Sequence, residues 1–260
     1  ATAEKLKDAG YTPFANGLKE DEESDMFMTL TPNFIGGSEG RALYMTTGGR
    51  CFNDFFAVRA FHSMEELIPY MSKDFTTVSS STSKQRFINQ DAAMLFGGSW
   101  DLRYFSENVK FDWSVFASPA PAGSKTTVIF QPDIAIGINN QISTAHQKAA
   151  LRFLEWLLTE KSLNLTNEIL PGFYPLNNTP TQQGSNIHSA EFQQLAEKYP
   201  TDLRWAYSEL YATNQVPRAS ELIQKGLYGI VTNKLSAQEA ANQLQAGMAE
   251  WYEPAQVCNQ

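Results

Sequence analysis

The feature that most constrains the fold is the segment from Asp91 to Asp101, an apolar stretch that ends on two glycines. It reads Asp-Ala-Ala-Met-Leu-Phe-Gly-Gly-Ser-Trp-Asp. Ala92 to Phe96 has the length and composition of a buried strand, and the glycine pair ends it in a tight loop. The loop presents an aromatic side chain, Trp100, and a carboxylate, Asp101. A strand-to-loop junction of this kind is typical of binding sites in proteins that combine strands with helices.

Helical and strand-like patterns alternate along the rest of the chain. Apolar residues at helical spacing predict helices over Thr2 to Ala9, Asp54 to Met71 and Thr144 to Thr159. Short apolar segments predict strands over Tyr11 to Ala15, Phe111 to Phe116 and Val128 to Ile138. Residues 189–253 are predicted to be mainly helical, with breaks near Pro200 and Pro217 and a capping box over Ser236 to Glu239. The fold class is therefore predicted to be α/β, with a helical C-terminal third.

Three segments are polar or rich in glycine. Pro32 to Arg50 contains five glycines and Thr76 to Ser83 is almost entirely Ser and Thr, so both are predicted to be loops. The acidic run Lys19 to Asp25 is predicted to be the solvated start of a helix, where carboxylates oppose the helix dipole favourably. A cation site is the alternative interpretation of this run.

Composition disfavours several classes of function. The chain carries 20 Lys and Arg against 28 Asp and Glu, a formal charge of −8, which disfavours nucleic acid and anionic membranes as partners. Its start, Ala1 to Lys7, lacks the pattern of a signal peptide. The sequence has no HExxH, GxSxG, P-loop or Rossmann motif, and its three histidines lack metal-ligand spacing. We therefore expect no catalytic, metal or cofactor site.

The two cysteines, Cys51 and Cys258, lack CxxC spacing, so the sequence gives no support to a zinc or thioredoxin-type site. A disulfide between them is an open alternative. Closing so long a loop would stabilise the fold by about 4 to 5 kcal/mol in the chain-entropy model.

Three segments resemble the extracellular solute-binding proteins of carbohydrate ABC importers, the family of the maltose-binding proteins, and they occur in the order expected for that family. These segments are Phe87 to Trp100, Asp112 to Leu158 and Pro171 to Leu176. The resemblance implies a periplasmic-binding-protein-like two-lobe fold of type II. Residues 1–127 would be the first segment of the C-terminal lobe, 128–172 a crossover strand and helix in the layer of the N-terminal lobe, and 173–260 the helical segment of the C-terminal lobe.

One departure from the family concerns the start of the chain. The family begins with a βαβ lobe of about a hundred residues or more, and nothing similar precedes Ala1. We therefore expect an N-terminally incomplete chain, with the apolar surface of Ile134 to Ile138 and Ala145 to Leu158 exposed when the chain stands alone. The expected location is periplasmic or extracellular, with a membrane tether through a missing N-terminus left open.

The resemblance and the chemistry of sugars together indicate candidate ligand-binding residues. A sugar site needs an aromatic plate and polar groups that give and take hydrogen bonds. Trp100 matches the family position that stacks on the sugar, with a core tryptophan as the alternative, and Asp101 either accepts hydroxyl hydrogens or caps a helix. Asp133 interrupts an apolar strand and so requires a ligand or a neighbouring cation. The other candidates, each with packing or surface roles as alternatives, are Tyr174, Trp205 and Arg218.

The expected function is a non-catalytic extracellular receptor that traps a sugar or oligosaccharide between two closing lobes and delivers it to the membrane permease subunits of an ABC importer. Three alternatives stay open. A carbohydrate-active hydrolase needs no fixed carboxylate spacing, the acidic charge suits a cationic solute such as a polyamine, and the helical C-terminal third offers a surface for protein interaction.

Overall fold

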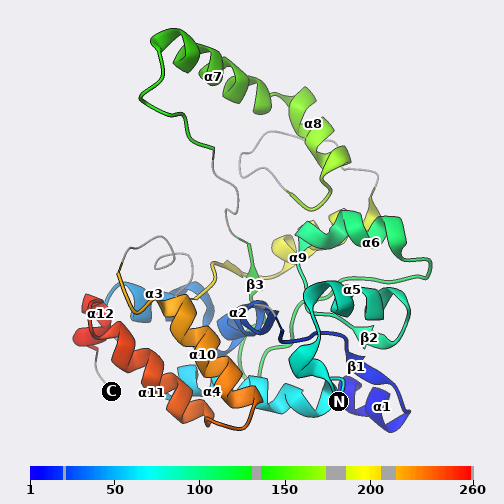
Figure 1. Cartoon of the computed structure of the whole chain (residues 1–260), viewed down its shortest axis with the longest axis vertical. Coiled ribbons are helices and arrows are strands. Elements are labelled where there is room, and N and C mark those ends of the chain that lie inside the picture. The colour runs from blue at the N-terminus through cyan, green and yellow to red at the C-terminus, as the bar shows by residue number, and fades with distance from the viewer. Residues whose placement is uncertain (20–21, 131–135, 174–185, 206–214, 259–260) are drawn as a thin grey trace. The chain divides into compact units, whose positions relative to one another are not determined.

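The computed structural model of the chain describes residues 1–19, 22–130, 136–173, 186–205 and 215–258 (Figure 1). These residues divide into two compact units. Unit 1 consists of Ala1–Gly97, Ala117–Phe130 and Tyr199–Gln260, and unit 2 of Gly98–Phe116 and Gln131–Lys198. The chain therefore passes between the two units at four points.

Four helices form the core of unit 1. They are α2 (Glu22–Ile35), α4 (Phe55–Leu67), α10 (Ala219–Val231) and α11 (Ala237–Met248). Helix α10 packs on the other three, and α4 packs on α2 and α11. Fully buried side chains from all four helices meet in one cluster, among them Phe27, Phe61, Ile223 and Leu244. Burial of this apolar surface is the main favourable contribution to the stability of unit 1.

Two of these core helices begin where the sequence predicts. The Asp54 carboxylate accepts a hydrogen bond of 2.9 Å from the amide of Ala57 at the start of α4. At the start of α11, Ser236 and Glu239 form the predicted capping box. Each arrangement satisfies amides that the first turn of a helix leaves without partners.

Two pairs of short parallel strands complete unit 1 among the described residues. β1 (Thr12–Phe14) pairs with β2 (Ala92–Met94), with Thr12 opposite Ala92 and Phe14 opposite Met94. β3 (Val128–Ile129) pairs with β4 (Thr201–Asp202). The other helices of unit 1 are α1 (Thr2–Asp8), α3 (Gly37–Met45), η1 (Ile68–Tyr70), η2 (Phe75–Thr77), α5 (Ser80–Ile88) and α12 (Glu253–Gln256). The predicted strands before Asn16 and after Asp91 are thus confirmed.

The two segments predicted to be loops contain helices, which corrects both predictions. Helix α2 continues to Ile35 and α3 starts at Gly37, because the glycines allow a tight turn: a Cβ on Gly40 would lie 1.7 Å from the Ile35 carbonyl oxygen. The Ser and Thr run starts α5 instead of forming only a loop, since the Ser79 side chain accepts a hydrogen bond from the amide of Thr82.

The strand predicted over Phe111 to Phe116 is also wrong. No residue of this segment is in a strand, and the amide of Val115 donates to the Glu191 carboxylate at 3.2 Å instead of to a neighbouring strand. Of the strand predicted over Val128 to Ile138, the structure contains β3 alone; residues 131–135 lie outside the described residues, and 136–138 form no strand.

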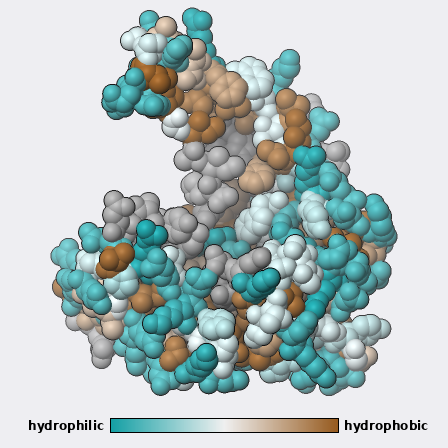
Figure 2. All heavy atoms as spheres, in the orientation of Figure 1, coloured by the Kyte–Doolittle hydropathy of each residue, from teal (hydrophilic) through white to brown (hydrophobic). Residues whose placement is uncertain are grey.

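Unit 2 is helical in its described part. Its elements are η3 (Ser99–Asp101), α6 (Leu102–Asn108), α7 (Thr144–Leu157), α8 (Glu160–Ile169) and α9 (Ile187–Lys198). Helix α7 confirms the helix predicted there, but it buries none of its residues. Its exposed apolar side chains include Leu151, Phe153 and Trp156, and Figure 2 shows apolar residues gathered over α7 and α8. The expected exposure of this segment is therefore observed. Among the described residues, no helix has both the length and the apolar character that crossing a membrane requires.

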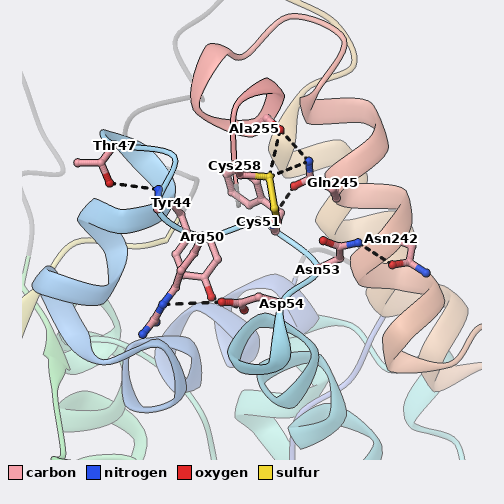
Figure 3. Close-up of a disulfide and its surroundings, with 12 residues drawn as sticks. Tyr44, Thr47, Arg50, Cys51, Asn53, Asp54, Asn242, Gln245, Ala255 and Cys258 are labelled. Atoms are coloured by element: carbon pink, nitrogen blue, oxygen red, sulfur yellow. Dashed lines mark hydrogen bonds and ion pairs between the residues drawn. A yellow bond between two sulfur atoms is a disulfide. The ribbon is translucent and has the colours of Figure 1, made fainter. Parts of the chain in front are cut away.

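Cys51 and Cys258 form a disulfide, so the pairing that the sequence left open is present (Figure 3). The two residues are 207 positions apart in sequence, and their Cα atoms lie 5.1 Å apart. Gln245 on α11 adds hydrogen bonds beside it, accepting from the amide of Phe52 at 2.8 Å and donating to the Ala255 carbonyl at 2.9 Å. The C-terminal helix α12 is thereby held on the segment that follows α3.

Candidate ligand-binding site

Trp100 lies in the short helix η3, directly after the glycine pair that ends the β2 segment. Its ring rests on the backbone of Gly98, where an added Cβ would lie 2.2 Å from the ring atom Cζ3. Glycine at position 98 therefore allows the indole to lie flat against the chain. The side chain of Trp100 remains 43% exposed. An aromatic surface supported by backbone on one side is thus accessible to solvent, whereas a core tryptophan would be buried.

A second loop is attached to this turn within unit 2. The hydroxyl of Ser99 donates a hydrogen bond of 2.5 Å to the carbonyl oxygen of Gly172. Gly172 has φ of +99°, and a Cβ there would lie 1.9 Å from the carbonyl oxygen of Ser99. The backbone of Gly172 thus approaches Ser99 more closely than any other residue type would permit. Two of the segments on which the family resemblance rests, the Trp100 turn and the Pro171–Phe173 turn, therefore meet.

Asp101 follows Trp100 and is buried. It occupies the N-cap position of α6, but its side chain makes no capping hydrogen bond. The helix it precedes packs by the buried side chains of Leu102 and Phe105. Of the two roles predicted for Asp101, the capping bond is thus not formed, and its contact with a ligand stays a prediction.

The structure does not place the other four predicted site residues beside Trp100: two lie outside the described residues and two belong to unit 1. Asp133 and Tyr174 lie outside the described residues. Trp205 belongs to unit 1, where it is fully buried and packs edge-on against Tyr44, with ring centroids 5.2 Å apart. Arg218, also in unit 1, is the N-cap residue of α10, and its half-exposed guanidinium lies 3.8 Å from the Glu221 carboxylate. These positions match the packing and surface alternatives, and a ligand role for either residue stays a prediction.

Tyr44, one of the rings that pack on Trp205, is held by a hydrogen bond to Asp54. Tyr44 donates to the Asp54 carboxylate at 2.5 Å (Figure 3). Burial first, and this hydrogen bond second, raise the pKa of Tyr44 well above its ordinary value. Tyr44 is therefore a neutral donor at physiological pH, and its bond to Asp54 supports the core around Trp205 at the start of α4.

A further cluster in unit 2 was not foreseen from the sequence. The ring of Trp113 stacks on that of His188 with centroids 3.7 Å apart, and His188 Nδ1 lies 2.9 Å from the Glu191 carboxylate. Trp113 is half-buried. The spacing of His188 and Glu191, three residues apart on α9, was the signal in the sequence for a side-chain pair on one helix face. Among the described residues, no three His, Cys, Asp or Glu side chains gather to hold a metal ion.

Comparison with known proteins identifies relatives over most of the chain. Residues 1–198 match the family model described as bacterial extracellular solute-binding protein. The chain is 24% identical over 254 residues to an uncharacterized ABC transporter extracellular-binding protein from Pyrococcus horikoshii, covering 90% of this chain and 56% of that protein. The chain thus spans little more than half the length of this relative.

Solved structures with the same fold include several sugar-binding proteins. A chitin oligosaccharide binding protein matches with a TM-score of 0.77 and 16% identity, over 94% of this chain and 61% of its own. A sugar transporter from Bacillus licheniformis in complex with stachyose matches with a TM-score of 0.69 and 15% identity, over 93% and 62%. A family 1 extracellular solute-binding protein from Bifidobacterium longum subsp. infantis matches with a TM-score of 0.68 and 21% identity, over 95% and 63%.

These matches confirm the predicted fold class, the α/β periplasmic-binding-protein-like fold of type II, and the family match covers well over half of the chain. The chain belongs to the family of bacterial extracellular solute-binding proteins.

Proposed function

We propose that this chain is part of a receptor that binds a sugar or oligosaccharide without altering it and delivers it to an ABC importer. The observation that carries the proposal is the exposed indole of Trp100, which lies on the Gly98 backbone and is fixed by the Ser99–Gly172 hydrogen bond. The C–H face of a pyranose ring is apolar and packs well on such a surface. Structures of similar fold include a chitin oligosaccharide binding protein and a stachyose complex, which favours a carbohydrate.

Polar groups around Trp100 would select among sugars. Asp101 would accept hydrogens from hydroxyl groups, because an ionised carboxylate is an acceptor only. Asp133 and Tyr174 are proposed as further contacts. Trp205 and Arg218 are weaker candidates because of their places in the core and at the start of α10.

We also propose a division of the chain between two lobes. Residues 1–127 and 173–260 would belong to the C-terminal lobe, and 128–172 would join the layer of the N-terminal lobe. The apolar side chains that α7 exposes support this division, because exposed surface of this kind marks an interface. The partners would be the permease subunits of the importer. The Cys51–Cys258 disulfide supports a periplasmic or extracellular location, since disulfides persist in oxidising compartments.

The experiment is calorimetric titration of the protein with stachyose, chitin oligosaccharides and spermidine, followed by chromatography of the recovered ligand. Binding of one sugar class, recovered intact, is expected. Trp100→Ala should weaken binding by roughly 30-fold or more, as for a central aromatic contact worth about 2 kcal/mol. Phe116→Ala is the matched control, because Phe116 is an aromatic residue that is 65% exposed in the same unit, and it should bind as the wild type does.

Each alternative function predicts a different result of this experiment. Hydrolysis of the sugar would favour the hydrolase, and binding of spermidine alone would favour a receptor for cations. Sugar binding that is equally strong in Trp100→Ala and in the wild type would contradict the proposed site.

A further inference from the structure

Two buried asparagine amides in unit 1 hold the chain close to the points where it passes into unit 2. Asn16, which follows β1, donates from Nδ2 to the carbonyl of Phe96 at 2.9 Å and accepts from the amide of Phe96 at 2.7 Å. The side chain thus bonds both backbone groups of one residue, as a neighbouring strand would. Phe96 lies two residues before unit 2 begins at Gly98.

Asn33, in the last turn of α2, acts in the same way on the segment where the chain returns to unit 1. Its Nδ2 donates to the carbonyl of Ser118 at 3.2 Å, and its Oδ1 accepts from the amide of Thr127 at 2.7 Å. Ser118 is the second residue of the segment that returns to unit 1 at Ala117, and Thr127 lies three residues before Phe130, after which the chain leaves unit 1 again. One side chain therefore holds both ends of the segment 117–130. Asn16 and Asn33 are both almost completely buried.

The fourth connection is held by an ion pair and by strand pairing. The amide of Phe130 donates to the carbonyl of Asp202 at 3.0 Å. The segment that ends at Phe130 therefore pairs with the segment that returns to unit 1 at Tyr199. Arg41 on α3 donates from Nε to the Asp202 carboxylate at 2.7 Å, and that carboxylate is 1% exposed. Asp202 lies four residues after unit 2 ends at Lys198.

The chemistry of these contacts suits a role in positioning. A buried amide side chain has one acceptor and two donors in fixed geometry, so a pair of bonds to the backbone fixes the direction of the chain as well as its position. Loss of such a side chain leaves buried backbone groups without partners, which is costly. Asn16, Asn33 and the Arg41–Asp202 pair are all in unit 1 and act on every one of the four crossings.

We propose that these side chains, named here the crossing anchors, are positioning residues that fix the ends of unit 1 at all four crossings. If unit 2 moves, the backbone torsion angles that change then belong to residues other than Phe96, Ser118–Phe130 and Asp202. The anchors belong to unit 1 and would limit the freedom of unit 2 through the backbone that they hold. The proposal is independent of the identity of the solute.

The test compares Asn16→Leu and Asn33→Leu with Asn53→Leu, in the intact protein. Asn53 is the matched control, since it also lies in unit 1 but bonds only to the Asn242 side chain among the contacts drawn in Figure 3. Spin labels on cysteines placed at Lys225 on α10 and Lys148 on α7, both exposed, report the distribution of distances between the units. Hydrogen exchange reports the local contacts.

We expect each anchor variant to speed amide exchange at its own crossing at least tenfold, at Phe96 for Asn16→Leu and at Thr127 for Asn33→Leu. Exchange in α10 and α11 should stay as in the wild type. The distance distribution should broaden in both anchor variants and remain unchanged in Asn53→Leu. If Asn16→Leu fails to fold, Asn16→Ser removes the same bonds with a smaller side chain, and Arg41→Gln tests the fourth crossing.

Faster exchange at the crossings with an unchanged distance distribution would overturn the proposal, because the amides would then stabilise only unit 1. Equal broadening of the distance distribution in Asn53→Leu would overturn it too, since loss of an asparagine away from the crossings would then have the same effect.

Discussion

The hydroxyl of Ser99 bonds to the carbonyl oxygen of Gly172, a residue 73 positions later in the chain. The contact joins the turn that carries Trp100 to a loop whose backbone has the left-handed conformation. The orientation of the indole therefore depends on a residue far from it in sequence. Changes at Gly172 should alter ligand binding even if the loop itself never contacts the ligand.

Gly172→Ala should destabilise the protein and weaken sugar binding together. The new Cβ meets the Ser99 carbonyl oxygen at 1.9 Å, in addition to the backbone cost of a positive φ. We expect a loss of about 2 to 4 kcal/mol in the free energy of unfolding, measured by urea titration. Gly123→Ala is the control, because Gly123 also has a positive φ of +85° but nothing within 4 Å of an added Cβ. Equal losses in the two variants would show that the close approach contributes nothing.

Reduction of the disulfide should lower the stability of unit 1. In the chain-entropy model a bond closing a long loop contributes about 4 to 5 kcal/mol, and native disulfides typically contribute about 2 to 5. The double variant Cys51→Ser, Cys258→Ser should lose a comparable amount in urea unfolding. The wild type in reducing agent is the matched sample and should unfold at the same urea concentration as the variant. A variant as stable as the oxidised protein would contradict the prediction.

Trp205 should matter to folding more than to ligand affinity. It is fully buried and its ring packs against those of Tyr44 and Phe52, at centroid distances of 5.2 and 5.4 Å. Trp205→Ala should cost about 3 to 5 kcal/mol in the free energy of unfolding. Trp205→Phe keeps an aromatic ring in the cluster, and calorimetry should find its sugar affinity unchanged. A folded Trp205→Phe protein with much weaker binding would give this residue a ligand role after all.

The Asp74–Arg86 ion pair should give a small stabilisation that acid removes. Hydrogen bonds from Arg86 first, and from Ser72 second, hold the pKa of Asp74 well below its ordinary value. Because the pKa is lower in the folded state, the pair stabilises the fold fully above the unfolded pKa of about 4, and the effect is lost progressively as the pH falls from there through the lower folded-state pKa. Asp74 is largely exposed, so the contribution at pH 7 should stay below about 1 kcal/mol.

Thermal unfolding of Asp74→Asn and Arg86→Gln checks this expectation. Both variants should unfold slightly earlier than the wild type at pH 7, and the difference should shrink as the pH is lowered below about 4 toward the folded-state pKa of Asp74. A difference that grows toward acid pH would have the wrong sign for a lowered pKa.

The sequence predicted best those elements whose signals are local. Asp54 before an apolar helical pattern, and Ser236 with Glu239 three positions later, mark helix starts that form as predicted. The glycines between Pro32 and Arg50 misled the prediction, because glycine serves both flexible loops and close contacts between helices. Only the position of the Ile35 carbonyl beside Gly40 distinguishes these two cases.

The same difference between local signals and contacts of distant residues applies to the candidate site. Trp100 could be found because the glycine pair before it is a local signal for a loop. The Ser99–Gly172 bond could not be found, since its acceptor is a backbone carbonyl, which every residue has. The burial of Trp205 beside Tyr44 and Phe52 could not be found either, because its place near a break in the helical pattern carries no information about burial.

The disulfide also makes the chain from Cys51 to Cys258 a closed covalent ring, and both segments of unit 2 lie inside it. A protease that cuts one peptide bond anywhere in unit 2 therefore opens the ring without releasing a fragment. The nicked protein should migrate as one species in non-reducing electrophoresis and separate into two pieces only after reduction. The bond thus keeps the parts of the protein together after a cleavage that would divide a chain without it.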